Sequence, residues 1–422
     1  MRLSGTVKLF TLLAISTTAL ASCGSTSSSS TSSSASSSVS SGSSSSTQTS
    51  GSSTLDIPSD AHITMLTDVG TIDDKSFNQG TWEGVEAWAQ ANGFTEGTTG
   101  GMTYNYLRPS AGDTASYEET IEDAIDAGAT VIVSPGYLFQ EAFEAETVAN
   151  PDVKFIGIDF TQTNIASATN AVNIVFKEQD AGFLAGYAAA EEGLTNLGFV
   201  GGMQIPAVYR YGSGFAAGIA YANYTDGKSA QFTASHVYYA GAFTESPTYE
   251  TTPSGWLAND GVDGIFGAAG QVNNNVFNVV ESYHETHTDL DGKAPWAIGV
   301  DVDQYNESEY VLTSAMKGLG VAVQDALDNV FSGFSDGGTS ITLGAKQDAA
   351  GIPTADDSWR FSNFTKDQYN AVLEKIENDD ASVKIPQVFD DNGADLASIL
   401  TGYDVDEDVA SALVAVLLPQ SD

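Results

Sequence analysis

Short apolar runs alternate with longer amphipathic segments along the chain from Ala61 onward. The first run, residues 63–66, precedes a segment in which Phe77, Trp82 and Val85 recur at helical spacing. The pattern predicts strands over 63–66, 102–107, 130–134, 154–158 and 172–175, and helices over 76–92, 116–127, 140–149 and 177–192. Such alternation is typical of a parallel sheet with helices on both faces.

The same rhythm then starts again. It predicts strands over 197–201, 231–239, 264–268 and 296–300, and helices over 212–222, 254–259 and 274–285. Two similar α/β lobes in tandem have a cleft between them, and the carboxyl ends of both sheets can face it. Ligands bind at that edge in open α/β sheets.

Asp68, Phe77 and Asn78 follow the first strand and come to this edge from one lobe. An acid, an aromatic ring and an amide in such a place can form a small-molecule site. Each also has a purely structural interpretation, because Asp68 can cap a loop and Phe77 can belong to the core. Asp159 ends the strand 154–158, where it can either contact a ligand or cap its loop.

Residues 1–23 are typical of an export signal. Arg2 and Lys8 supply positive charge, and residues 9–15 form an apolar core too short to span a bilayer. A Leu-Ala-Ser-Cys sequence ending at Cys23 resembles a lipobox, the site at which bacterial lipoproteins are cleaved and lipidated. The alternative is an ordinary secretory signal with a chance cysteine. Cys23 is the only cysteine, so no internal disulfide is expected.

Residues 24–58 are mostly serine, with some threonine and glycine. Such a segment cannot bury apolar area, so we expect a disordered tether. With a lipid on Cys23, the protein would be held at the extracellular face of the cell membrane by two acyl chains.

The chain has 15 Lys and Arg against 55 Asp and Glu, a formal net charge of −40, and 41% hydrophobic residues. This balance excludes nucleic acid as a partner, since phosphates require basic patches. The charge is interpreted as a solubility feature of an exposed extracellular protein, and attraction of cationic ligands is the alternative. No GxSxG, Walker A or HExxH motif is present, so neither an enzyme nor a cofactor or metal is expected.

Motifs recur in order along the chain after the serine-rich segment. They occupy residues 67–70, 73–79, 176–179, 183–187, 199–203, 214–218, 268–270 and 298–305. Together they resemble the basic membrane protein (BMP, PnrA-like) family, whose members are lipoprotein substrate-binding components of ABC importers and bind purine nucleosides.

The resemblance implies a type I periplasmic-binding-protein fold, α/β in class. In this fold two doubly wound parallel-sheet lobes are joined by three crossover strands. It places the N-terminal lobe at residues 59–173 and 314–338, and the C-terminal lobe at 174–313 and 339–422.

The resemblance also suggests roles for individual residues. Phe77 would stack on the base, and Asp68 and Asn78 would hydrogen-bond the ligand. Tyr211 would supply the second aromatic face, although core residue Phe215 is the alternative source, and the Tyr211 hydroxyl needs a partner or water. The ligand-binding set is Asp68, Phe77, Asn78, Asp159, Tyr211, Gly270, Asp301 and Lys317.

Within this set, Gly270 would allow close backbone approach to the ligand. Asp301 and Lys317 would hold the ribose hydroxyls, with a surface ion pair as the alternative interpretation.

The expected function is therefore capture of adenosine, guanosine or inosine and delivery to an ABC permease. Two alternatives remain open. The same fold could bind a pentose or another small polar solute, or the chain could be an extracellular sensory or adhesion module with a degenerate pocket.

Overall fold

The computed structural model describes residues 55–419, except 289, 291–293 and 390–392. The expected export signal, Cys23 and all of the serine-rich segment before Leu55 lie outside the described residues. Over the described ranges, no helix combines the length and apolarity needed to cross a membrane.

The first lobe is built on a seven-stranded sheet whose pairings are all parallel. The strand order is β12-β6-β5-β4-β1-β3-β2. The strands are β1 (His62–Leu66), β2 (Thr95–Glu96), β3 (Thr103–Leu107), β4 (Val131–Pro135), β5 (Lys154–Ile158), β6 (Ala171–Phe176) and β12 (Thr339–Leu343).

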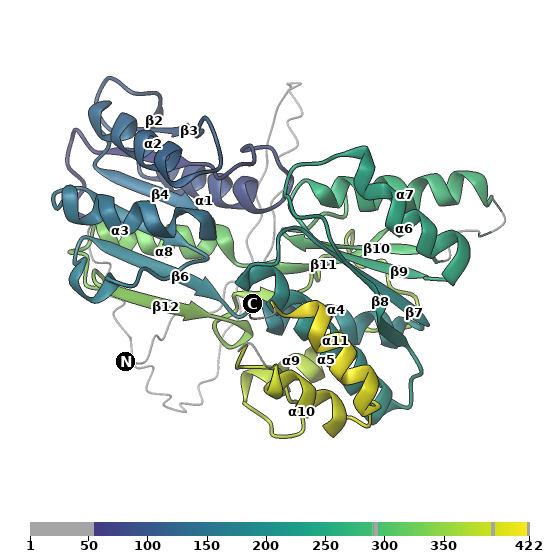
Figure 1. Cartoon of the computed structure of the whole chain (residues 1–422). Coiled ribbons are helices and arrows are strands. Elements are labelled where there is room, and N and C mark those ends of the chain that lie inside the picture. Colours follow the sequence, from purple (N-terminus) through teal and green to yellow (C-terminus); the bar gives the residue numbers. More distant parts are fainter. Residues whose placement is uncertain (1–54, 289, 291–293, 390–392, 420–422) are drawn as a thin grey trace, which may run out of the picture. The chain divides into compact units, whose positions relative to one another are not determined.

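Helices cover both faces of this sheet (Figure 1). On one face, α1 (Phe77–Ala91) and α8 (Leu319–Val330) bury an apolar cluster that includes Trp88 and Val323. On the other, α2 (Thr114–Asp126) and α3 (Gln140–Ala149) pack on the alternate strand residues. Successive side chains of a strand point to opposite faces of the sheet. Because helices cover both faces, the strands are apolar throughout.

The second lobe has a six-stranded sheet in the order β13-β11-β10-β9-β7-β8. Its strands are β7 (Asn196–Gly201), β8 (Gln231–Tyr239), β9 (Gly264–Ala268), β10 (Trp296–Asp301), β11 (Val311–Lys317) and β13 (Ala350–Gly351). All pairings are parallel except that of the two-residue strand β13, which is antiparallel to β11.

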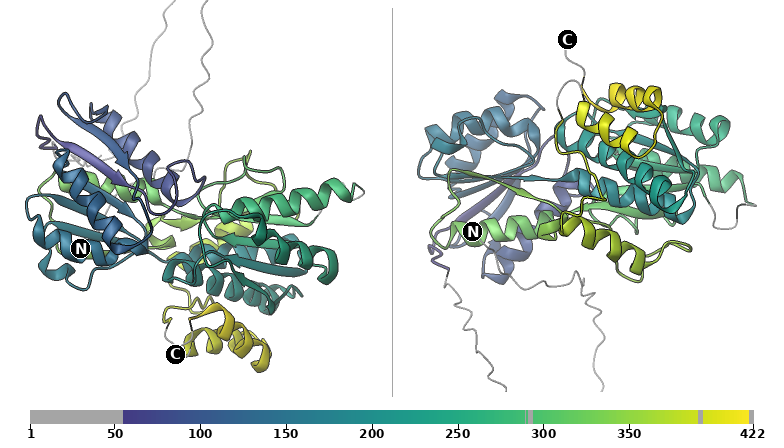
Figure 2. Two further views of the ribbon diagram at one scale, coloured as in Figure 1. Left: turned by 45° about the horizontal axis from the view of Figure 1, so that its top comes forward. Right: turned by 90° about the horizontal axis from the view of Figure 1, so that it is seen from below.

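Two helical layers cover the second sheet. One layer contains α4 (Glu178–Glu192), α5 (Pro206–Asp226), α9 (Lys366–Glu377), α10 (Ala394–Gly402) and α11 (Glu407–Leu417). The other contains α6 (Thr251–Gly255), the π-helical turn η4 (Trp256–Asp260) and α7 (Val272–Thr286). Figure 2 shows α10 and α11, in yellow, packed on this lobe.

The chain passes between the lobes three times, after β6, after β11 and after β12. Two doubly wound parallel-sheet lobes with three crossovers confirm the predicted fold class. The third crossing lies beyond the expected boundary at residue 338. The reason is that β12 pairs in parallel with β6 along all five of its residues and therefore belongs to the first sheet.

The prediction that a helix begins at residue 212 is wrong. Helix α5 begins at Pro206, where proline occupies the first turn and loses no hydrogen bond for lack of an N–H. Tyr211 consequently lies within the helix and not in a loop before it.

Candidate functional site

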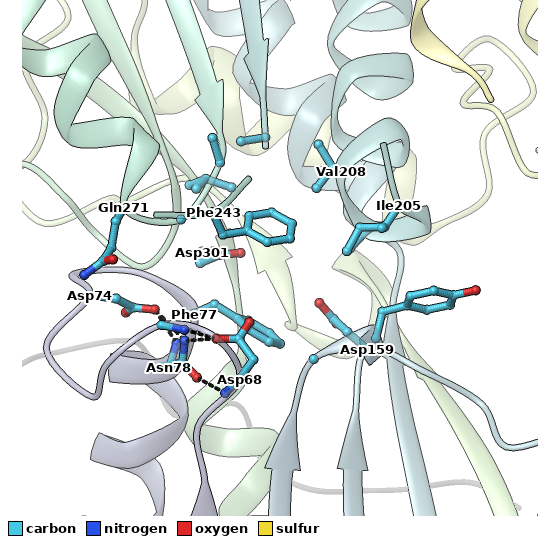
Figure 3. A pocket seen from close by; sticks show the side chains of 18 of the residues that line it. Asp68, Asp74, Phe77, Asn78, Asp159, Ile205, Val208, Phe243, Gln271 and Asp301 are labelled. Atoms are coloured by element: carbon cyan, nitrogen blue, oxygen red, sulfur yellow. Dashed lines mark hydrogen bonds between the residues drawn. The ribbon is translucent and has the colours of Figure 1, made fainter. Parts of the chain in front are cut away.

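A cavity of about 640 Å³, its open mouth included, lies between the two lobes. Carboxyl ends of strands from both sheets contribute to its walls (Figure 3). Eight lining residues are those predicted from the sequence: Asp68, Phe77, Asn78, Asp159, Tyr211, Gly270, Asp301 and Lys317.

The loop between β1 and α1 supplies one wall of the cavity through a polar network. Asn78 Nδ2 donates to Asp68 Oδ1 at 2.8 Å and to Asp74 Oδ2 at 2.8 Å, and Asn78 Oδ1 accepts from the Asp68 backbone N–H at 3.1 Å. Asp74 also accepts from three backbone N–H groups at the start of α1, those of Ser76, Asn78 and Gln79.

This network changes the interpretation of Asn78. Both of its N–H donors are occupied, so direct donation to a ligand would require one of these bonds to break. Asn78 therefore holds Asp68 and Asp74 in place. Asp68 accepts from Gly70 N–H and Asn78 through Oδ1 alone, and among the described residues no hydrogen bond uses its Oδ2.

Two half-buried phenylalanines line the cavity from opposite lobes. Phe77 comes from α1, and Phe243 comes from the loop that follows β8 (Figure 3). Tyr211 also lines the cavity, but it is only 2% exposed and its ring meets Phe266 edge-on. Its hydroxyl donates to Asp301 Oδ1 at 3.3 Å, which supplies the partner that the phenol requires.

Phe215 is fully buried among aromatic rings and does not line the cavity. Gly270 lines the cavity with φ of 56°, a left-handed conformation that favours glycine. A side chain there would also approach the backbone oxygen of Phe243 at 3.3 Å. The Phe243 loop therefore uses the space that Gly270 leaves.

Lys317 ends β11 with its side chain 3% exposed, surrounded by three carboxylates. Its ammonium is hydrogen-bonded to Asp159 Oδ2 and lies 3.6 Å from Asp301 Oδ1 and 3.8 Å from Glu178 Oε1. Asp159 and Asp301 both have positive φ, 69° and 66°, at the ends of their strands. Two strand ends from different sheets thus converge on one lysine.

Burial controls the electrostatics of this region. It raises the pKa of Asp68 to about 6, with smaller opposing contributions from its hydrogen bonds to Gly70 and Asn78. It also raises the pKa of Asp159, although the adjacent Lys317 lowers it. For Lys317, burial acts to lower the pKa, but the charges of Asp159, Asp301 and Glu178 together raise it, so the ammonium stays protonated.

The cavity thus combines rings from two lobes with a lysine held among carboxylates. Such a surface can take a flat apolar group and several hydroxyl groups at once. Within the described ranges, no group of three or more His, Cys, Asp or Glu side chains has the arrangement of a metal site.

Residues 61–387 match the model of a protein family described as ABC transporter substrate-binding protein PnrA-like. The chain belongs to this family. Its members are substrate-binding components of ABC transporters and not enzymes, and the family implies a ligand and a permease partner.

Several curated proteins are similar over most of the chain. A CD4+ T-cell-stimulating antigen of Listeria monocytogenes is 33% identical over 344 residues, 78% of this chain and 88% of that protein. The ABC transporter nucleoside-binding protein BmpA of Lactococcus lactis is 30% identical over 305 residues, 69% of this chain and 80% of that protein. An uncharacterized lipoprotein of Pyrococcus abyssi is 30% identical over 312 residues, 72% of each chain.

Among solved structures, an ABC transporter solute-binding protein from Aeropyrum pernix superposes with a TM-score of 0.60 at 22% identity. The match covers 85% of this chain and 99% of that one. A second, from Conexibacter woesei, superposes with a TM-score of 0.54 at 18% identity over 76% and 97% of the two chains. At these identities the likeness establishes the fold alone.

The sequence analysis does not predict several other lining residues of this family member, nor one residue that contacts Lys317 without lining the cavity. Phe243 follows the end of β8, so the strand-end rule could have found it. The sequence does not indicate Ile205 and Val208, because both precede residue 212, where the pattern predicts that the helix begins. Glu178 contacts Lys317 from the start of α4, and nothing in the sequence pattern indicates that contact.

Proposed function

We propose that this chain is a lipid-anchored receptor at the extracellular face of the cell membrane. It binds purine nucleosides in the interlobe cavity and passes them to an ABC permease. The main support for this proposal is that one cavity combines apolar rings from both lobes with a buried lysine–carboxylate group. The nucleoside-binding name of the Lactococcus lactis relative supports the same ligand class.

In this proposal, Phe77 and Phe243 take the two faces of the base. Stacking of a base on an aromatic ring contributes about 1–3 kcal/mol. Asp68 Oδ2 accepts from the edge of the base, and Asn78 keeps that carboxylate in position. Lys317 with Asp159 and Asp301 holds the ribose hydroxyls, since carboxylates accept from a diol and an ammonium donates to it.

Isothermal titration of the purified full chain with adenosine, guanosine and inosine tests this function. We expect binding of at least one nucleoside in the micromolar range or tighter, about −8 kcal/mol. Absence of binding tighter than about 1 mM, about −4 kcal/mol, would reject it. Ribose and xylose belong in the same titrations, because a pentose that binds more tightly than every nucleoside would favour the sugar-binding alternative.

The lipid anchor has a separate test, because Cys23 lies outside the described residues. In cells, Cys23→Ser should release the protein from the membrane fraction into the medium. Retention of the variant in the membrane fraction would contradict the lipobox.

A further inference from the structure

Glu178 is the first residue of α4. It does not contact the cavity itself but lies next to Lys317, which does. Its side chain is 1% exposed and does not line the cavity. Its Oε2 lies 3.4 Å from Arg210 Nη1, and its Oε1 lies 3.8 Å from Lys317 Nζ. Oε1 is buried and accepts no hydrogen bond in the described structure.

An ammonium group has three N–H donors, and the Lys317 ammonium faces three carboxylates. Asp159 accepts a hydrogen bond from it, while Asp301 and Glu178 lie at ion-pair distances. A ligand hydroxyl that accepts from Lys317 must therefore compete with a carboxylate. Of the three carboxylates that compete with a ligand for the Lys317 ammonium, Glu178 lies outside the cavity, whereas Asp159 and Asp301 line it.

We propose that Glu178 is a positioning residue for the sugar end of the cavity, because its charged carboxylate competes with a bound ribose for the Lys317 ammonium. The inference rests on the proposed nucleoside function. When Glu178 is neutral, the third Lys317 donor is available to the ligand. When it is charged, that donor is drawn toward the start of α4.

The pKa of Glu178 is raised to about 7, first by burial and second by the charge of Asp159, against the opposing effect of the cations Lys317 and Arg210. The carboxyl group therefore changes charge near neutral pH. Below this pKa the neutral form predominates and leaves Lys317 to the ligand. Nucleoside affinity should consequently decrease as pH rises through about 7.

Charged and titratable groups from three other elements face Glu178. Helix α5 presents a cation at 3.4 Å and two phenols, β11 presents the ammonium, and the end of β5 presents a carboxylate. These groups are Arg210, Tyr209, Tyr211, Lys317 and Asp159. The pKa values of both phenols are raised, first by burial, so neither phenol changes charge near neutrality.

The test is isothermal titration of the full chain with guanosine, inosine and adenosine between about pH 6 and pH 8. For the wild type, Kd should increase over this range by up to about tenfold, which corresponds to about 1.4 kcal/mol. In Glu178→Gln the increase around pH 7 should disappear, and affinity at about pH 8 should match the low-pH affinity of the wild type. Any titration of Asp68 near its pKa of about 6 remains in both proteins.

Glu191→Gln is the matched control. Glu191 also lies on α4, is buried, forms an ion pair with Lys228 at 3.2 Å and has an Oε1 without a hydrogen-bond partner among the described residues, but it is not part of the cavity. This variant should keep the wild-type pH profile. A Glu178→Gln variant that loses affinity equally at every pH has lost a structural contact only, and this result would overturn the inference.

Arg210→Gln gives an independent answer if Glu178→Gln does not fold. Arg210 lowers the pKa of Glu178, so its loss should move the midpoint of the pH profile to a higher pH. An unchanged midpoint would overturn the inference. A wild type that binds no nucleoside at any pH would instead reject the proposed function, and the inference with it.

Discussion

Individual side chains in the cavity combine structural and ligand-facing roles. Asp74 accepts hydrogen bonds from the first turn of α1, Asn78 connects it to Asp68, and Asp68 presents its second carboxylate oxygen to the cavity. Phe77 adjoins this network and is only half buried. Lys317 lies 4.6 Å from the centre of the Phe77 ring, a cation–π distance. Because Phe77 is partly exposed and its ring takes no part in these hydrogen bonds, changing it should affect ligand binding more than the fold.

Phe77→Ala should weaken nucleoside binding by about 1–3 kcal/mol, or roughly 5- to 150-fold, because one face of the base loses its stacking partner. Isothermal titration measures the change. Tyr224→Ala is the control, since Tyr224 is 54% exposed and does not line the cavity. Unchanged affinity in Phe77→Ala would favour a sugar ligand, which gains little from base stacking.

Asp301→Asn should weaken the binding of nucleosides by about 1.5–3 kcal/mol, the range for hydrogen bonds to charged groups. Free bases should be affected much less, because they lack the ribose that Asp301 is proposed to hold. Asparagine suits this position because it tolerates the positive φ of 66° better than alanine. Isothermal titration with guanosine and guanine compares the two losses.

The control is Asp303→Asn. Asp303 lies two residues further on, in the loop after β10, accepts a hydrogen bond from Ser358 and does not line the cavity. Equal losses for guanosine and guanine in Asp301→Asn would contradict the ribose assignment.

At the scale of elements, the close approach of α4 and α5 positions the residues of α5 that line the cavity. Four glycines allow it, two on each helix. A side chain on Gly182 would lie 2.2 Å from the Tyr211 carbonyl oxygen, and one on Gly218 would lie 2.0 Å from that of Phe183. The same helices carry Glu178, Arg210 and Tyr211.

Gly182→Ala should therefore force α4 and α5 apart. We expect destabilisation of about 1–3 kcal/mol, typical of overpacked cores, together with weaker ligand binding as Tyr211 moves. Urea unfolding and isothermal titration measure the two effects. Gly255→Ala is the control, because Gly255 is helical and faces open space. A Gly182→Ala variant as stable as wild type would show that the helices adjust without cost.

The C-terminal segment is a further element that bears on the site. Residues 388–419 lie outside the family match, yet Phe389 contacts α5. Its ring lies 5.8 Å from the Arg210 guanidinium, on the helix that lines the cavity. Gln204 donates to the backbone oxygens of Val416 and Leu417 from just before α5. The C-terminal segment therefore packs against the start of α5 and stabilises it.

At the scale of the whole described unit, the lobes also touch directly beside the cavity. Ser76 Oγ donates to Asp301 Oδ2 at 2.6 Å, and Gln304 Nε2 donates to the Lys75 backbone oxygen at 2.7 Å. Lys75 and Glu307 form an ion pair in the same region. The loop between β1 and α1 thus both lines the cavity and joins the lobes.

Buried carboxyl groups should make the unliganded protein more stable at mildly acidic pH. Burial raises the pKa of Asp68 and of Asp180 to about 6, and that of Glu178 to about 7. A raised folded-state pKa means that the folded state binds more protons than the unfolded state. The free energy of unfolding is therefore higher at low pH and decreases as pH rises through the range in which these groups ionise, up to about 6–7.

Thermal unfolding should accordingly give a higher Tm at about pH 5.5 than at about pH 8. The net charge of −40 acts in the same direction by self-repulsion, but that effect is screened by salt. The buried-group effect should persist at about 1 M salt, where the Debye length is only about 3 Å. A pH dependence of Tm that vanishes at high salt would assign it to surface charge alone.

The sequence by itself determined the two α/β lobes, because local periodicity and the residues at the ends of each element indicate most strands and helices. It also indicated the eight cavity positions, most of which follow strand ends or lie in short motifs. The periodicity places the start of α5 at residue 212 and not at Pro206, because nearly all residues after the proline are buried and no alternation of apolar and polar positions marks the first turns of the helix.

Only the tertiary structure decided which groups share the lysine and which rings face each other. Glu178 and Lys317 are 139 positions apart in sequence and meet because the chain crosses between lobes after β6 and β11. Phe243 lies on the wall opposite Phe77 because separate sheets aim their carboxyl ends at one cavity. Contacts between lobes depend on how distant elements pack, and no local pattern of residues records that packing.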